Sequence, residues 1–414
     1  MTIRLSTLQI HSTGLRGLLD VQKAVSNTQQ QIASNKRVLT PGDDPIASTR
    51  ILALRQELAL NNQYNSNLET LRNRLQREET AIAGIDDLIS SAQELVTQAG
   101  NGALNADQRK FMAVELQTIV ESMAQLMNSR DANGEYIFAG YQGKSAPFVL
   151  GDDGRYRYEG DEGNKTIQIG GATSVAASDN GKKLFVDVKS VTNTVVAFAN
   201  EGNRGLPPAD IGSERIQDKE AFAEFYPEDV IIEFRPLEEV DPATLNYTVK
   251  QASDGRILSK NQPYVSGETI TFGGASVRIT GQPAVGDTFI VESSNKKGLL
   301  TNLEDFVVSL KTLGDNPTDR QTLSNEVADT LGNLTSAQNA LLETRSSVGA
   351  RLNLVESTVD SNAEFELVIK EALSEIEDLD YAEAISQLTQ ESFILEAAQA
   401  SFARVSRLSI FNFF

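Results

Sequence analysis

Two long stretches of the chain carry apolar residues at the alternating steps of three and four that keep side chains on one face of a helix. The first stretch has these residues at Leu68, Leu71, Leu75, Ile82, Ile85, Ile89, Ala92 and Val96. Glu78 is the one charged interruption. The stretch spans about 43 Å at ~1.5 Å per residue. A stripe this narrow cannot bury itself, so it predicts a long helix that needs partner helices.

The same spacing returns near the other end of the chain. The apolar positions there are Val327, Leu331, Leu334, Leu341, Val348, Leu352, Val355 and Val359, followed by Ile369, Leu373 and Ile376. Gln338 and Arg345 interrupt the pattern. We expect the two stretches to form a helical rod whose core includes Leu68, Leu75, Ile82, Ile89, Leu334, Leu341, Val348 and Val355.

Shorter seams with the same spacing occupy both extremes of the chain, and the last seven residues are strongly apolar. We expect these side chains to be buried between subunits of an assembly: Leu18, Val21, Val25, Ile32, Leu388, Leu395, Phe402, Val405, Ile410, Phe411, Phe413 and Phe414. The alternative is that the ending folds back against the N-terminal helix of the same chain. Because isolated helices of this length are marginal in water, we expect both ends to be largely disordered in the free subunit and helical between neighbours.

From about residue 136 to residue 295 the apolar period changes to two, and glycine is frequent. Alternating runs occur at 166–169, 184–188 and 230–234, and 269–272 is joined to 275–279 by Gly273-Gly274, as in a two-residue hairpin. Strands without intervening helices predict an antiparallel β domain. The fold class is therefore α+β: the terminal segments pair as a discontinuous helical coiled-coil rod, and the β domain is inserted between them.

Capping residues predict where three of the helices begin. Asp44 precedes Pro45, which suits a first helical position that needs no N–H. Asn105 with Gln108 predicts a second helix start, and Asn316-Pro317 a third.

Composition narrows the functional classes. The 414 residues include 37 Lys+Arg and 57 Asp+Glu, for a net charge of −20, which argues against nucleic-acid binding. The absence of Cys removes thiolate chemistry, and a single His excludes a two-His metal site within one chain. We expect no enzyme activity, no cofactor and no metal. No apolar run is long enough to span a membrane, and the first residues lack the apolar core of a cleaved signal peptide.

The residues that could carry chemistry all have simpler explanations. His11 has no aligned nucleophile and orienting group. In the pair Asp43-Asp44, helix capping explains Asp44, and Asp43 can be solvated. Neither 152–154 nor 161–163 has the ligand spacing of a calcium loop, so turns are expected there. Gly170-Gly171 does not open a helix in the manner of a phosphate-binding loop.

Four segments together resemble the flagellin superfamily, and within it the hook-associated proteins. They are 29–38 followed by Pro41-Gly42-Asp43-Asp44-Pro45, then 347–353, 378–388 and 408–414. The Asp-Asp-Pro form and the Phe-rich ending resemble the hook-associated members more than flagellins. The resemblance covers about residues 1–140 and 297–414.

The resemblance implies an organisation and a role. It implies a terminal coiled-coil domain from 1–43 and 378–414, a rod domain from 44–135 and 297–377, and an outward β domain at 136–296. It implies a structural adaptor of the bacterial flagellum that joins the hook-associated layer to the filament. The implied partners are the first hook-associated protein, flagellin, neighbouring copies and an export chaperone. It further implies type III export without a cleaved signal peptide and an extracellular location.

Two other functions remain open on the sequence. A flagellin that polymerises into the filament itself would share the helical ends, so the periodicity does not separate the two. An adhesin or other binding module on a helical stalk is compatible with the Gly-rich middle, although that segment shows no aromatic platform.

Overall fold

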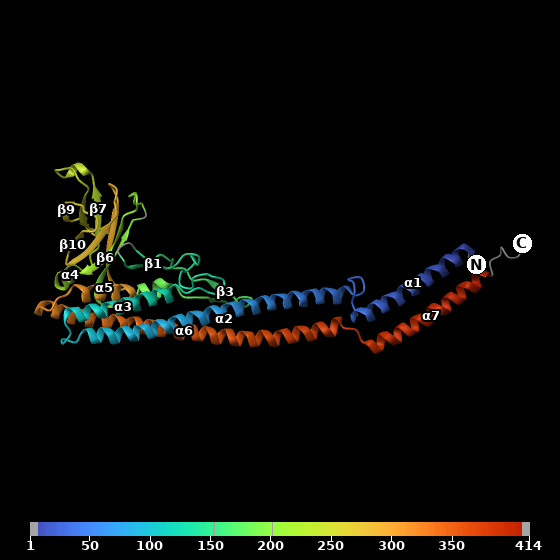
Figure 1. Ribbon diagram of the computed structural model, residues 1–414. Coiled ribbons are helices and arrows are strands. Elements are labelled where there is room, and N and C mark those ends of the chain that lie inside the picture. The colour runs from blue at the N-terminus through green and yellow to red at the C-terminus, as the bar shows by residue number, and fades with distance from the viewer. Residues whose placement is uncertain (1–6, 152–153, 201, 408–414) are drawn as a thin grey trace. The chain divides into compact units, whose positions relative to one another are not determined.

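A computed structural model describes residues 7–151, 154–200 and 202–407 (Figure 1). Its contacts divide the chain into two compact units: unit 1 comprises residues 1–66 and 357–414, and unit 2 comprises residues 67–356. Two long helices, α2 (Pro45–Ala99) and α6 (Pro317–Glu377), contribute to both units. The predicted domain boundaries near residues 43 and 377 lie between helices, whereas the boundary between the two units lies inside α2 and α6. The five-part division stays a prediction.

No helix in the described part of the chain combines the length and apolar character needed to cross a membrane.

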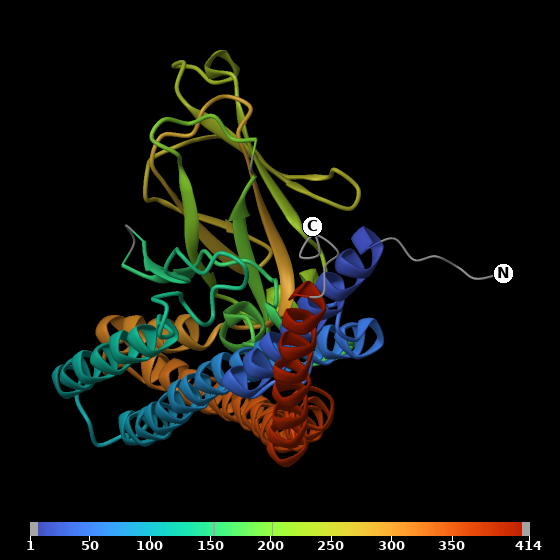
Figure 2. The same ribbon diagram turned by 90° about the vertical axis from the view of Figure 1, so that its right-hand side faces the viewer.

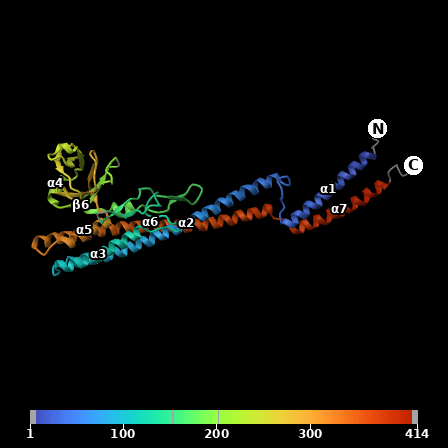
Figure 3. The ribbon, with the colours of Figure 1, turned by 45° about the horizontal axis from the view of Figure 1, so that its top comes forward.

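Unit 1 is built from pairs of helices whose members come from opposite ends of the chain. Helix α1 (Thr7–Ser34) lies beside α7 (Tyr381–Arg407), as Figures 1 and 3 both show. The start of α2 pairs with the end of α6. There Asn61 Nδ2 donates to the Asn362 carbonyl at 3.0 Å, and Asn362 Nδ2 donates to Asn65 Oδ1 at 3.0 Å. Polar layers of this kind fix the register of paired helices.

The helical part of unit 2 adds two further helices to the α2–α6 pair. These are α3 (Ala106–Met127) and α5 (Leu299–Thr312). The main core joins apolar residues of all four, including Ile82 and Ile89 of α2, Met123 of α3, Phe306 of α5 and Leu341 of α6. The expected pairing of N- and C-terminal segments, with a β-rich insert between them, is confirmed.

The three predicted helix starts are confirmed. Asp44 Oδ1 accepts the backbone N–H groups of Ile46 and Ala47 at 3.1 and 3.0 Å, which caps α2. Asn105 and Gln108 form a capping box at α3, and Asn316 Oδ1 accepts the Asp319 N–H at 2.8 Å at the start of α6.

The Asp43 side chain accepts hydrogen bonds from the backbone, whereas the sequence predicted that it would only be solvated. Its Oδ2 accepts the backbone N–H groups of Leu39 and Thr40 at 3.2 and 2.8 Å, so it braces the loop between α1 and α2. These bonds favour the charged form and lower its pKa, the hydrogen bond from the Thr40 backbone most of all.

The β-rich part of unit 2 contains two facing sheets and two small hairpins, and Figure 2 shows the strands on one side of its helices. One sheet has the order β5-β12-β7-β8-β9 and the other β10-β11-β6, and every strand pair is antiparallel. Their strands are β5 (Lys189–Ala199), β6 (Asp210–Ile216), β7 (Val230–Arg235), β8 (Asn246–Gln251), β9 (Ile257–Pro263), β10 (Thr269–Phe272), β11 (Ala275–Thr280) and β12 (Thr288–Lys296). The shared core includes Phe234, Val277 and Phe289, and Phe222 of the short helix α4 (Lys219–Phe225) packs into it.

The hairpins lie between the helices and the sheets in the chain order. They pair β1 (Phe148–Leu150) with β2 (Tyr156–Tyr158) and β3 (Thr166–Gln168) with β4 (Ser174–Ala176). The β3–β4 hairpin contributes Ile169 and Val175 to a separate cluster with Leu68, Leu71 and Val348. The hairpin therefore packs as a third element against this part of the α2–α6 pair.

The strand predictions were correct in most places and wrong in one. The runs at 166–169 and 230–234 correspond to β3 and β7, and β10 and β11 are joined through Gly273 and Gly274, both with positive φ. The first three residues of the run at 184–188 instead belong to a π-helical turn, η1 (Lys182–Val186). The run opens with three consecutive apolar residues, which also fit a single turn, and here Leu184 and Phe185 both enter the helical core. A 3₁₀ turn, η2 (Leu237–Glu239), follows β7.

The heptad positions predict a measurable stability difference between adjacent leucines. Leu341 is buried in the main core, whereas Leu342 is 48% exposed. We expect Leu341→Ala to lower the free energy of unfolding by about 2–5 kcal/mol. The matched change Leu342→Ala should cost no more than about 0.5 kcal/mol. Denaturant midpoints would measure both, and equal midpoints would show that the helices are wrongly paired.

Candidate assembly surface

The helices of unit 1 bury one face and leave large apolar side chains on the other. Between α1 and α7, Val25 and Thr28 are buried on the α1 side. The other predicted interface residues with described side chains are half-buried: Leu18, Val21, Ile32, Leu388, Leu395 and Phe402. The α1–α7 pairing therefore already covers part of each seam within one chain.

Three contacts fix the pairing of α1 with α7. Thr28 Oγ1 donates to Glu391 Oε2 at 2.8 Å, and the Tyr381 hydroxyl donates to the Ile32 carbonyl at 3.3 Å. Gly14 lies against the ring of Phe402, so close that a Cβ at position 14 would come within 3.1 Å of Cδ2. The small residue allows the two helices to approach where the aromatic ring crosses.

This pairing bears on the expectation that both ends become helical only between neighbouring copies, which stays a prediction. The described residues of α1 and α7 are helical in one chain, because the opposite end of the same chain supplies the partner that each seam needs. The ending 408–414, with the predicted residues Ile410, Phe411, Phe413 and Phe414, lies outside the described residues, as does the side chain of Val405. Burial between subunits stays a prediction for the whole set.

The outer faces of the same four helical segments carry the exposed apolar side chains. They are Leu15 and Leu19 on α1, Ile46, Leu52 and Leu60 on α2, Val359, Phe365, Leu367 and Val368 on α6, and Tyr381, Ile385, Phe393 and Ile394 on α7. We call this set the unit 1 apolar surface. On the helices of unit 2, the exposed large apolar residues are Phe111, Val114, Leu342 and Leu354.

The difference between the units follows from the number of layers. In unit 2, α3, α5 and the β3–β4 hairpin cover the α2–α6 pair, and all eight predicted rod-core residues are buried. In unit 1 the helices are paired without such a cover among the described residues. Two-helix pairs bury only one stripe each, and extended apolar surface that remains exposed marks an interaction site.

A polar brace holds the ends of the helices together within unit 1. Arg37 donates its backbone N–H to the Glu377 carbonyl at 2.8 Å, and Lys36 and Arg55 both pair with the Glu377 carboxylate. Burial alone raises the pKa of Glu377, but the hydrogen bonds from Lys36 and Arg55 outweigh it and hold its pKa below the ordinary value. Glu377 is therefore charged at neutral pH and keeps the α1–α2 loop on the last turn of α6.

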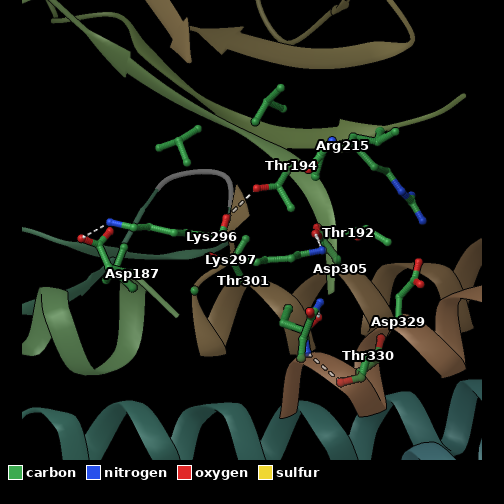
Figure 4. Close-up of a pocket in the computed structure, with 18 of the residues that line it drawn as sticks. Asp187, Thr192, Thr194, Arg215, Lys296, Lys297, Thr301, Asp305, Asp329 and Thr330 are labelled. Carbon is green, nitrogen blue, oxygen red and sulfur yellow. Dashed lines mark hydrogen bonds and ion pairs between the residues drawn. The ribbon is translucent and has the colours of Figure 1, made fainter. Parts of the chain in front are cut away.

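A second feature, a polar pocket in unit 2, has no evident chemistry. It has a volume of about 220 Å³ and lies between β5, β6, β12 and the helices α5 and α6 (Figure 4). Lys296 pairs with Asp187 at 3.0 Å, and Lys297 pairs with the buried Asp305 at 2.6 Å. Lys219 pairs with Asp329. These three lysines are each paired with an acid of the fold.

Metal-ligating side chains do not cluster anywhere in the described residues. Among them, no group of three or more His, Asp or Glu side chains could hold a metal ion. The side chain of His11 and residues 152–153 lie outside the described part. Asp161 accepts the N–H groups of Tyr141, Gln142 and Gly163, which is the turn expected at 161–163.

Sequence reasoning missed most of the unit 1 apolar surface. Residues such as Leu19, Leu367 and Phe393 fall outside the seven-residue seam. A prediction based on one apolar stripe per helix does not detect a second stripe on the same helix. The signal that could have found them is the second apolar stripe itself, for example Ile385 and Ile394 beside the seam residues of α7.

Both helical ends of the chain match regions of the same protein family. Residues 5–143 match the bacterial flagellin N-terminal helical region, and residues 331–414 match the bacterial flagellin C-terminal helical region. The two matches together include more than half of the chain. The segment between them, which contains the two facing sheets, is matched by neither.

Among curated proteins, the chain is similar to flagellar hook-associated protein 3 of Salmonella typhimurium, with 34% identity over 45% of this chain and 58% of that protein. It is 31% identical to flagellar hook-associated protein 3 of Escherichia coli over 47% of this chain and 60% of that protein. The chain thus spans less than two thirds of the length of these relatives. Flagellin FlaB1 of Treponema pallidum is 23% identical over 46% of this chain and 66% of that protein.

Two solved structures share the fold. The FlgL protein of Xanthomonas campestris matches with a TM-score of 0.51 and 27% identity, over 78% of this chain and 99% of that one. The hook-associated protein 3 of Legionella pneumophila matches with a TM-score of 0.53 and 22% identity, over 79% of this chain and 98% of that one. The second likeness bears on the fold alone.

Two phenylalanines of α7 should separate pairing within the chain from the exposed surface. Phe402 is half-buried against Gly14, whereas Phe393 is 71% exposed. We expect Phe402→Ala to weaken the α1–α7 pair by about 1 kcal/mol, and so to speed amide exchange in α7 about fivefold. Phe393→Ala should leave the exchange unchanged. Hydrogen exchange of the soluble subunit measures both, and equal rates in the two variants would contradict the pairing.

Proposed function

This chain belongs to the flagellin superfamily, and from that premise we propose that it is the structural adaptor of the bacterial flagellum that joins the hook-associated layer to the flagellin filament. The joining is by packing of helices between subunits. The role is mechanical and requires no catalytic group, cofactor or metal.

The observation that carries the proposal is the unit 1 apolar surface. Each fully buried Leu, Ile or Phe side chain contributes ~1.5–3 kcal/mol, so the exposed residues on α1, α2, α6 and α7 are costly in water. Covering this surface with the equivalent helices of adjoining subunits would recover that energy. An adaptor needs such a surface for its own copies and for the different subunits on each side of its layer.

The identities of the relatives support a junction role over a filament role. The two relatives named flagellar hook-associated protein 3 are 34% and 31% identical, whereas the flagellin of Treponema pallidum is 23% identical. The structure with 27% identity is also named FlgL. The Phe-rich ending at 408–414 and the Asp43-Asp44-Pro45 loop point the same way.

The proposal includes partners and a location. The partners are the first hook-associated protein, flagellin, neighbouring copies of this chain and a chaperone that binds it before export. The location is the extracellular flagellum, reached by type III export without a cleaved signal peptide. The relatives are themselves named as flagellar components, which supports the location.

A deletion strain tests the role directly. Electron microscopy of cells that lack this protein should show hooks without filaments, with flagellin shed into the medium. Hooks that still carry filaments of normal length would contradict the proposal. If the purified protein alone grew into long filaments, the filament subunit itself would be the better assignment.

Charge introduced on the unit 1 apolar surface should block assembly without unfolding the subunit. We expect Leu367→Asp with Phe393→Asp to abolish complementation of the deletion strain while leaving the denaturant midpoint of unit 2 unchanged. The matched control is Leu206→Asp, because Leu206 is 86% exposed but lies in the β-rich insert. Full motility with the double variant, or its loss with the control, would count against this surface.

Removing 410–414 tests the predicted role of the ending. The truncated subunit should fold with an unchanged circular dichroism spectrum and midpoint, yet join the flagellum less well than the full chain. Unfolding of the truncated subunit would instead favour the alternative in which the ending packs against its own N-terminal helix.

A further inference from the structure

A carboxyl group lies in the helical core of unit 2, where the heptad pattern calls for an apolar side chain. Glu78 of α2 is fully buried. Its Oε1 accepts the backbone N–H of Asp179 at 2.8 Å, and its Oε2 has no hydrogen-bond partner among the described residues. A buried ionised carboxylate with an unmade hydrogen bond is costly, so this site favours a protonated Glu78.

The groups that face Glu78 come from two other segments. The loop 177–180 brings Asp179, and α6 brings Arg351. Arg351 Nη1 donates to the Ala176 carbonyl at 3.1 Å, and its Nη2 pairs with the Asp179 carboxylate. One turn earlier on α2, Arg74 pairs with Asp131 and Glu135. Arg351, the cation of α6 that faces Glu78, is thus already held by Asp179, and a charged Glu78 would add a second carboxylate beside it.

The loop that carries Asp179 directly follows the β3–β4 hairpin. The hairpin covers Leu68, Leu71 and Val348 through Ile169 and Val175. Its polar attachments to the helices include the bond from Asn67 Nδ2 to the Gln168 carbonyl at 2.7 Å and the bonds made by Glu78 and Arg351. The state of Glu78 therefore bears on the contact that closes the hairpin over the α2–α6 pair.

We propose that Glu78 is a proton-operated latch, which holds the β3–β4 hairpin and the loop 177–180 closed over the helices when it is protonated and releases them when it is ionised. The device is independent of assembly and of the proposed function. It explains why a carboxyl group interrupts an otherwise apolar stripe at the position that meets this loop.

The direction of the pH dependence follows from the two states. Burial, followed by the charge of Asp179, raises the pKa of Glu78 to about 8 when the hairpin is closed. Opening admits water and returns the group to its ordinary pKa of 4.5. Closing therefore takes up a proton. The closed state is most stable below the ordinary pKa of Glu78, loses stability as pH rises, and is least stable above the closed-state pKa. Within that window the closed-to-open ratio falls about tenfold per pH unit.

Hydrogen exchange of the full chain at pH 5.5, 6.5 and 7.5 tests the latch. Dividing the intrinsic exchange rate by the observed rate gives protection factors that are free of the base catalysis of exchange itself. For the peptide 166–180 we expect the protection factor to fall about 100-fold over the two pH units. Strands β7 and β8 serve as the internal control, and their protection should remain constant.

Three variants isolate the latch. Glu78→Gln keeps the acceptor for the Asp179 N–H but cannot ionise, so protection of the peptide should be independent of pH. Glu78→Met serves the same purpose if Gln disturbs the fold, which the protection of β7 and β8 would reveal. Glu79→Gln, one residue along α2, should retain the full wild-type slope. A flat wild-type profile, or an equal slope in the wild type and in Glu78→Gln, would overturn the proposal.

Discussion

The pairing of segments from opposite ends of one chain is the constraint on which both units depend. The α2–α6 pair contributes to both units, and α1 pairs with α7 in unit 1. Such pairing brings together residues more than 300 positions apart, as in the bond between Thr28 and Glu391.

What differs along the pairs is how many layers cover them. Where α3, α5 and the β3–β4 hairpin add a third side, leucines such as Leu68 and Leu341 are buried completely. In unit 1 the paired helices keep apolar side chains such as Leu367 and Phe393 in water. The proposed packing between subunits would cover these side chains of unit 1, whereas unit 2 buries its core within one chain.

Much of this organisation could be predicted from the sequence, since it depends on local and periodic signals. The seven-residue spacing located α2 and α6, Asp44 and Asn105 marked helix starts, and Gly273-Gly274 marked a hairpin. Each of these signals acts over a few residues or repeats along one face. The fold class followed from the change of period between the ends and the middle.

The misses involve residues whose surroundings come from elsewhere in the chain. The run at 184–188 forms a turn because Leu184 and Phe185 enter a core made by distant helices. In the sequence, Glu78 only interrupts an apolar stripe. Its proposed role depends on Asp179 and Arg351, which come from distant parts of the chain. Likewise, the seams predicted that the two ends pair, but the contacts that set their register, such as the bond from Thr28 to Glu391, depend on both helices at once.

Cross-linking within a single subunit tests the pairing of the two ends most directly. The chain has no cysteine, so Thr28→Cys with Glu391→Cys can be joined specifically by a short bismaleimide in dilute, monomeric protein. The account predicts a rapid intrachain link, seen as a monomer whose tryptic peptides from α1 and α7 are joined. Links found only between chains, or none at dilutions where the protein is monomeric, would contradict it.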